Sequence, residues 1–239
     1  TVENYLSAMV SSYQQELNPT LRLPYQITVE NRMLYNLEQN GSMNFVPGVI
    51  ALVFMIVSTA LTSVAVVREK ELGTMEILLV SPFNPLKILV AKAVPYLILS
   101  LINFTVILLL SVYMLDVPIR GNLLLLYGES TLFIIICLSL GLLISTSTSS
   151  QQTAMLIAMM GMMLPTAFFT GFMFPIENMP LVFQGISKIF PSSYYYSIVK
   201  KVMLKGLGFS YIWKETLILI TMAVVFLSLA MKKFKVRLE

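Results

Sequence analysis

The stretch that decides the fold reads VPGVIALVFMIVSTALTSVAVV over residues 46–67 and continues as REKELGTMEILLVSPFNPLK over residues 68–87. The first part is an uncharged apolar run, about as long as a helix must be to cross the roughly 30 Å hydrocarbon layer of a membrane. The second part, the charged segment, opens with four consecutive charges, Arg68 to Glu71. A charged, helix-compatible segment beside a span is expected at the membrane surface, where it can contact a soluble partner.

The composition predicts an integral membrane protein. Hydrophobic residues make up 57% of the chain and charged residues 12%, and the mean hydropathy is +0.82, far above the range of soluble domains. The net charge of +4 is scattered around the apolar stretches, without the basic stripe of a nucleic-acid-binding protein. We expect the basic excess to contact membrane lipids and set the topology. With one cysteine, Cys137, and no histidine, the sequence predicts no intrachain disulfide and no metal site.

Hydropathy predicts an all-α protein with five membrane-spanning helices, because only helices pair all of their backbone groups within one span. The expected spans are 46–67, 88–114, 122–144, 153–174 and 210–231. Lysines and arginines divide evenly between the two sides of this topology. The basic run at 232–237, directly after the last span, favours a cytoplasmic C-terminus.

The charged segment has two faces if it is helical. Leu72, Met75 and Leu79 fall on one face at spacings of three and four residues. The charged residues form a polar surface; they are Arg68, Glu69, Lys70, Glu71 and Glu76. From these residues alone, two interpretations stay open: a solvated loop at the membrane surface, or a docking surface for a partner.

The segment from Val67 to Pro82 resembles the signature of permease subunits of the type-2 ABC exporter family, which includes bacterial drug, lipid and polysaccharide exporters. The residues at 143–154, 171–180 and 190–195 also resemble segments of that family, and the likeness covers nearly all of 31–239. Family members carry six spans, with an extracellular domain after the first. The resemblance therefore implies that the first family helix is missing here.

The resemblance implies two parts in this chain. Residues 1–45 are expected to be the C-terminal remnant of the extracellular or periplasmic domain, and residues 46–239 the transmembrane permease domain. The expected location is the cell membrane, in the bacterial inner membrane as a multi-pass protein. By the same resemblance, two permease subunits pair as a homodimer or a heterodimer, and each rests on an ABC ATP-binding subunit.

The resemblance also implies a coupling helix at about 68–80 that docks into the ATP-binding subunit. The chain has no Gly-x-x-x-x-Gly-Lys-[Ser/Thr] phosphate loop, so we expect no ATPase site and no bound cofactor in it, and ATP and Mg on the partner. The residues expected at the docking surface are Arg68, Glu69, Lys70, Glu71, Leu72, Gly73, Thr74, Met75, Glu76 and Leu79.

The region at 175–208 is cut by prolines and carries tyrosines at 194–196 and lysines at 200, 201 and 205. Prolines end helices and tyrosines suit the membrane interface, so we expect paired short helices dipping into the outer leaflet. We also expect Pro165 and Gly171 to kink the fourth span. The residues predicted to form an outer gate are Gly171, Pro175, Glu177, Pro180 and Pro191.

Two polar residues in the spans are candidates for a buried polar site. Glu129 lies about seven residues inside the third span. It is either a proton-relay or substrate-cation site, or an interfacial residue beside Tyr127 if that span begins later. We expect Asn103 to form a hydrogen bond with a neighbouring helix, and Lys92 to extend to the inner head groups.

The spans also carry two side-chain patterns. The first span has a stripe of mostly small residues, Ala51, Met55, Ser58, Thr62 and Ala65, which favours close helix packing over substrate contact. The fourth span carries Met155, Met159, Met160, Met162 and Met163. Core filling is the favoured role for these methionines, with an adaptable lining for apolar cargo as the alternative.

Together these observations predict the permease subunit of an ATP-driven ABC exporter. We expect an amphiphilic, drug-like or lipid-like substrate, since no polar channel stripe is evident. The alternative is an ion- or proton-coupled secondary transporter or channel that uses Glu129. An intramembrane enzyme is disfavoured because the only aspartate is Asp116, histidine is absent and no Gly-x-Ser-x-Gly motif occurs.

Overall fold

The computed structural model describes residues 8–10, 12–13, 41–73 and 85–236. The chain divides into two units, Thr1–Asn40 and Gly41–Glu239. In the first unit, only short helical pieces at 8–10 and 12–13 are described. The expected extracellular remnant at 1–45 therefore lies mostly outside the described residues, and the fold below is that of the second unit.

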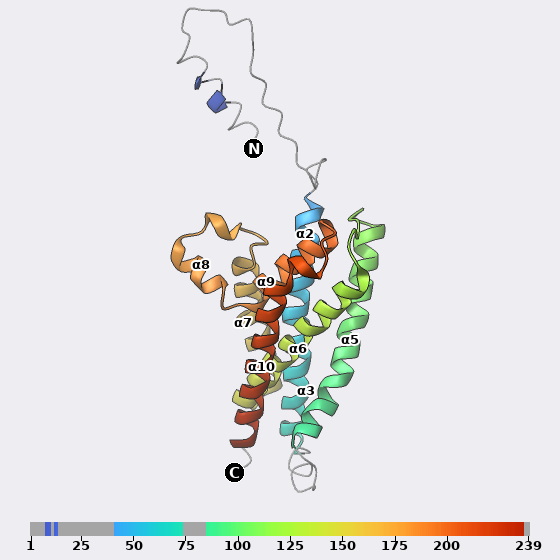
Figure 1. The fold of residues 1–239 in the computed structure, drawn as a ribbon. Helices are drawn as coiled ribbons and strands as arrows, with labels where there is room; N and C mark the ends of the chain where they lie inside the picture. The colour runs from blue at the N-terminus through green and yellow to red at the C-terminus, as the bar shows by residue number, and fades with distance from the viewer. Residues whose placement is uncertain (1–7, 11, 14–40, 74–84, 237–239) are drawn as a thin grey trace, which may run out of the picture. The chain divides into compact units, whose positions relative to one another are not determined.

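The second unit is built from helices, and the described residues contain no strand (Figure 1). Five helices are long and apolar enough to cross a membrane within these ranges, which confirms the predicted fold class. The long helices are α2 (Ser42–Val53) with the π-helix η1 (Phe54–Ser58) and α3 (Thr59–Glu71) in one continuous run, α5 (Pro85–Tyr113), α6 (Leu123–Ser147), α7 (Gln151–Phe169) and α10 (Trp213–Val236). The shorter elements are η2 (Ile176–Asn178), α8 (Leu181–Ser187), α9 (Pro191–Val199), the π-helix η3 (Lys200–Leu204) and η4 (Phe209–Tyr211).

Two helix ends differ from the expected spans. The first spanning helix continues beyond residue 67 to Glu71, so that the first turn of the charged segment belongs to it. The fourth ends at Phe169 rather than near 174. Gly171 follows with φ +82°, a left-handed conformation that L side chains disfavour. Gly171 therefore lies in the turn after the helix instead of kinking it, whereas Pro165 lies inside α7.

Helix α6 is the central helix, with α3, α5, α9 and α10 packed against it (Figure 1). The α3–α6 contact is close, because a Cβ added to Gly141 would lie 2.6 Å from the carbonyl oxygen of Thr59. The side chain of Thr59 donates a hydrogen bond to the carbonyl of Cys137 at 3.1 Å. The small-residue stripe of the first span forms part of this packing: Ala51, Met55, Ser58 and Thr62 are buried.

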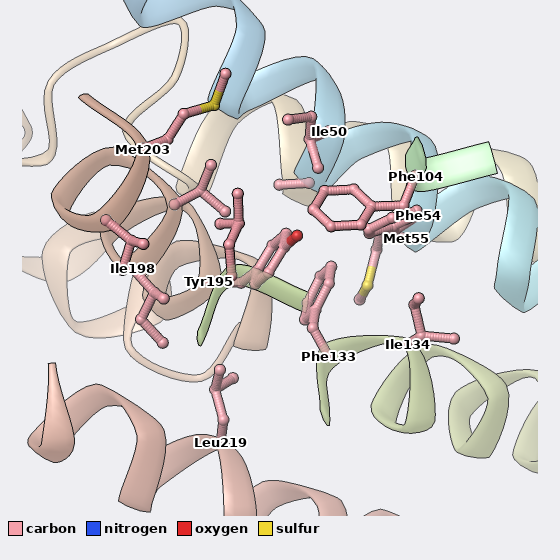
Figure 2. Packing of buried hydrophobic residues seen from close by; sticks show 14 of the residues in the cluster. Ile50, Phe54, Met55, Phe104, Phe133, Ile134, Tyr195, Ile198, Met203 and Leu219 are labelled. Carbon is pink, nitrogen blue, oxygen red and sulfur yellow. The ribbon is translucent and has the colours of Figure 1, made fainter. Parts of the chain in front are cut away.

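The core joins the short helix α9 to the spanning helices (Figure 2). Tyr195 of α9 is fully buried and stacks on Phe133 of α6 with ring centroids 4.2 Å apart. Its hydroxyl is hydrogen-bonded to that of Ser130 at 2.7 Å. Phe54 of η1 lies between Tyr195 and Phe104, at 6.2 and 5.5 Å. Because α9 inserts among long helices, its backbone is positioned by them rather than by a loop.

The faces of α5 and α7 that point away from the core are apolar. Exposed side chains on α5 include Ile98, Ile102 and Val106. The methionines of α7 are also on an outer face, since Met155, Met159, Met160 and Met163 are all exposed; only Met162 packs against the core. The favoured prediction of core filling is therefore wrong for these four. Lipid or another protein can cover such a face, because apolar surface of this extent is uncommon on soluble monomers.

Candidate functional site: two ends of one helix

The charged segment begins inside the last turn of α3. The amide of Leu72 donates to the carbonyl of Arg68 at 3.0 Å, and that of Gly73 to the carbonyl of Lys70 at 3.2 Å. Gly73 has φ +71°, a conformation common just after a helix end. The helix thus ends here. Of the expected coupling helix at 68–80, the first turn extends a spanning helix, while Thr74, Met75, Glu76 and Leu79 lie outside the described residues.

Two charges of this turn are directed at neighbouring helices. Glu69 forms an ion pair with Lys92 of α5, and the ammonium of Lys70 donates to the carbonyl of Ser145 near the end of α6. The carbonyls at a helix C-terminus attract cations because they lack partners within the helix. The expectation that Lys92 extends to the head groups is therefore wrong, since its ammonium is bound to a carboxylate inside the bundle.

Glu71 caps the start of α7. The backbone amide of Gln151 donates to Oε1 of Glu71 at 2.8 Å, and the side-chain amide of the same residue donates to Oε2. The residue at the capping position, Ser150, makes no side-chain capping bond. A carboxylate at a helix N-terminus both accepts an unpaired amide and complements the helix dipole. Glu71 of one helix thus caps another.

We call this group the α3-end cluster: Glu69, Lys70, Glu71, Lys92, Ser145 and Gln151. It ties the end of α3 to α5, α6 and α7. Arg68 and Leu72 remain exposed, Leu72 to 66% of its surface. A cavity of about 580 Å³ lies beside them, and its lining includes Arg68, Leu72, Tyr96 and Met155. The residues expected to dock therefore divide into an inward-directed set and an outward-directed set.

The opposite end of the α2–α3 helix borders a second cavity, of about 490 Å³. Asn44 lines it and lies 24 residues before Arg68, about 36 Å along a helix axis. The other polar lining residues come from the turn after α7 and from α9 and η3: Thr170, Glu177, Ser193, Tyr196, Ser197, Lys200, Lys201 and Lys205. We call this the lysine cavity.

The lysine cavity carries more positive than negative charge. Lys201 forms an ion pair with Glu215 of α10, which balances it. Lys200 lies 5.5 Å from the ring centroid of Tyr196. Burial and the nearby Lys205 ammonium lower the pKa of Lys200, whereas the Glu177 carboxylate raises it. Glu177 is therefore the acidic lining residue that faces two lysines.

The predicted gate residues surround this end of the bundle. Gly171 and Pro175 line the lysine cavity with Glu177. Pro180 is the residue before α8, and Pro191 is the first residue of α9, where a proline costs the helix no hydrogen bond. The structure thus shows the expected short helices with prolines at their starts. The gating role stays a prediction.

Glu129 is inside the bundle and not at its edge. Helix α6 begins at Leu123, with Asn122 accepting the capping bonds, so the expectation of a later start is wrong. Glu129 is 4% exposed, and Thr216 of α10 donates to its Oε1 at 2.8 Å. The other oxygen, Oε2, is buried without a hydrogen bond to any described residue. Glu129 therefore joins α6 to α10.

Asn103 is half-buried on α5. Within residues 41–73 and 85–236, no hydrogen bond joins its side chain to another helix, so the expected bond is not seen. Its neighbours on the helix surface, Leu99, Ile102 and Val106, are exposed, which places Asn103 at the edge of the outward face of α5. The bond between the hydroxyls of Ser58 and Ser100 at 2.8 Å joins α5 to η1 instead.

Sequence reasoning missed several residues of both sites. Ser145 takes part through its backbone carbonyl, which no side-chain pattern reveals. Gln151 was part of an expected turn, yet its amide at a helix start is a general signal for a carboxylate partner. The lysines at 200, 201 and 205 were noted only as positive charge in a proline-rich region. Their convergence depends on the π-helical turn of η3.

These observations define a multi-pass, all-helical membrane protein with a charged cluster at one end and a cationic cavity at the other. The chain belongs to the ABC-2 family transporter proteins, which it matches over residues 1–232. It is similar to two Escherichia coli K12 proteins, "Probable multidrug ABC transporter permease YbhS" at 35% identity and the same-titled YbhR at 34%. The similarity covers 89% of this chain in both cases, and 56% and 57% of those proteins.

A eukaryotic relative is "ABC transporter G family member 20" of Dictyostelium discoideum, 28% identical over 77% of this chain and 25% of that protein. No solved structure matches the chain at a significant level. The chain spans little more than half the length of the bacterial relatives named above.

Proposed function

We propose that this chain is the transmembrane permease subunit of an ATP-driven ABC exporter. It pairs with a second permease subunit, and separate ABC ATP-binding subunits hold ATP and Mg and supply the energy. The chain itself has no ATPase site. The observation that carries the proposal is the match to the ABC-2 family over nearly the whole chain, together with the family-like signature at the end of α3.

The α3-end cluster supports a route for coupling. Arg68 and Leu72 are exposed and are suited to contact a soluble subunit through charge and apolar burial. Directly behind them, Glu69, Lys70 and Glu71 bind α5, α6 and α7. A displacement of this end by the ATP-binding subunit is therefore passed to three other helices at once.

The proposed substrate is an amphiphilic drug-like or lipid-like molecule. Two relatives carry the words "multidrug ABC transporter permease" in their titles. The outward faces of α5 and α7 are apolar, which suits lateral exit into lipid. We place the protein in a bacterial inner membrane with its C-terminus in the cytoplasm, on the same side as the α3-end cluster, because α3 and α10 run in the same direction through the bundle (Figure 1).

The test is affinity isolation of the intact, full-length protein in mild detergent, with Arg68→Glu as the variant. Wild type should bring down an ATP-binding subunit and support ATP-dependent efflux of a fluorescent amphiphile from inverted membrane vesicles. R68E should insert into the membrane normally but lose both. The matched control is Lys232→Glu, which reverses an exposed charge near the end of α10 and should keep both. Efflux without ATP would contradict the proposal.

The alternative, proton-coupled transport through Glu129, is separated by Glu129→Gln. The amide oxygen of glutamine can still accept the Thr216 hydrogen bond, but glutamine cannot take up a proton. ATP-dependent efflux should persist in E129Q if the exporter proposal holds. Efflux driven by a pH gradient in wild type and lost in E129Q would favour the alternative.

A further inference from the structure

We propose that the lysine cavity binds the phosphate head group of an anionic lipid. The cavity has about the space of a small ligand site, 490 Å³, and its walls come from four segments: the start of α2, the turn after α7, η2, and α9 with η3. The inference stands apart from the proposed function, because it concerns binding and needs neither ATP nor a partner subunit.

The charge of the cavity selects an anion. Lys201 is balanced by Glu215, which leaves Lys200 and Lys205 facing the single carboxylate of Glu177. The ammonium groups of Lys200 and Lys205 repel each other, since each disfavours the charged form of its neighbour. A phosphate between them relieves this repulsion and completes the neutralisation that Glu177 begins.

The polar lining offers further donors. Asn44 and Ser197 line the cavity from α2 and α9, and both side chains can donate hydrogen bonds to phosphate oxygens. The hydroxyls of Thr170 and Ser193, by contrast, already donate to the backbone carbonyls of Thr166 and Ser187. The donors thus come from two helices on different sides of the cavity, as a site for a multi-oxygen anion requires.

The surroundings suit a lipid better than a free anion. Phe172, Met173 and Ile176 line the same cavity. A second cavity, of about 380 Å³, shares Pro175 with it and is almost entirely apolar; its lining includes Phe168, Phe169, Phe174, Met179 and Phe183. Cationic and apolar cavities that adjoin at one residue match the head and the chains of an amphiphile.

The walls of the cavity are rigidly placed. A Cβ on Gly48 would lie 2.0 Å from the ring of Phe172, so this ring rests directly on the backbone of α2. Phe45 contacts the same ring with centroids 5.5 Å apart. Gly171 provides the left-handed turn, φ +82°, that brings Phe172 there. The cavity is therefore built by tertiary contacts and not by a surface loop alone.

The experiment titrates the purified full-length protein in detergent with phosphatidylglycerol and follows binding by native mass spectrometry and by the rise in Tm. Phosphatidylcholine with the same acyl chains is the neutral control, and inorganic phosphate is the free-anion control. We expect phosphatidylglycerol to bind and to raise Tm, and neither control to do so. The double variant K200Q/K205Q should bind it about tenfold more weakly.

Two further variants keep the result decisive. K232Q/K233Q removes two exposed lysines at the end of α10 and should bind like wild type. Ser197→Phe fills the cavity while leaving its lysines in place, and should also weaken binding if the protein keeps its lipid-free Tm. Equal binding of the two lipids, or unchanged binding in K200Q/K205Q, overturns the proposal. Phosphate binding as tight as that of phosphatidylglycerol overturns the lipid assignment and leaves a free-anion site.

Discussion

At the Glu71 end of the α2–α3 helix, each of three charged residues has a partner on a different helix, whereas at the Ser42 end two lysines face one carboxylate around a cavity. The first arrangement consumes its charge in holding helices together. The second leaves an excess of positive charge beside open space. Charge at a helix end is thus a clasp in one place and a candidate ligand site in the other, according to what the neighbouring helices present.

The comparison predicts that removing a partner costs more at the clasped end. Lys92→Met leaves the half-buried Glu69 without its counter-charge, and we expect the protein to lose about 1–3 kcal/mol of stability, since an uncompensated buried charge is costly. A fall in Tm in detergent measures this. The swap E69K/K92E should recover most of the loss. Equal Tm values for K92M and the control Lys232→Met would mean that the ion pair holds nothing together.

At the other end, the cavity wall depends on steric fit rather than charge. Gly48→Ala places a methyl group inside the ring position of Phe172, and we expect about 1–2 kcal/mol of destabilisation from overpacking, together with weaker phosphatidylglycerol binding. The double variant G48A/F172A removes the clash and should regain Tm. It should not regain full lipid binding if the Phe172 ring forms the wall. A G48A protein with unchanged Tm and binding would contradict this placement.

The smallest expected effect is at Glu71. Because this side chain is at the solvent-exposed surface, Glu71→Ala should lower Tm less than K92M or G48A, although α7 loses both bonds that Glu71 accepts from Gln151. Hydrogen exchange of the first turn of α7 is the sensitive measurement and should increase locally. Glu71→Gln retains acceptor capacity and should lie between wild type and E71A. Uniform exchange across the three proteins would show that the cap is dispensable.

Much of the architecture was predictable because a membrane restricts the choices. Each span must be a helix of limited length, so hydropathy alone located five helices to within a few residues. Helix ends were less accurate, as at Glu71 and Phe169. A charged turn can extend a spanning helix when other helices supply counter-charges, and hydropathy does not count such partners.

The candidate sites were predictable only in part. The charged segment stood out by composition, and its first four residues do form a site. That Glu69 and Lys70 are directed inward, and Arg68 outward, follows from which helices lie beside α3. The α7 methionines had the composition of core residues but lie on an outer face, because in lipid an apolar side chain is stable on either face and composition does not distinguish them.

The order of apolar and charged residues along this chain sufficed for its class, its helical crossings and its membership of a transporter family. These depend on local physics: the cost of unpaired backbone in hydrocarbon and the length of a helix that spans it. The partners of each charge required the packed bundle. Lys92 is 23 residues from Glu69, and Gln151 is 80 from Glu71, so these contacts, like the convergence of the lysines on one cavity, arise from how helices pack and not from the spacing of residues along the chain.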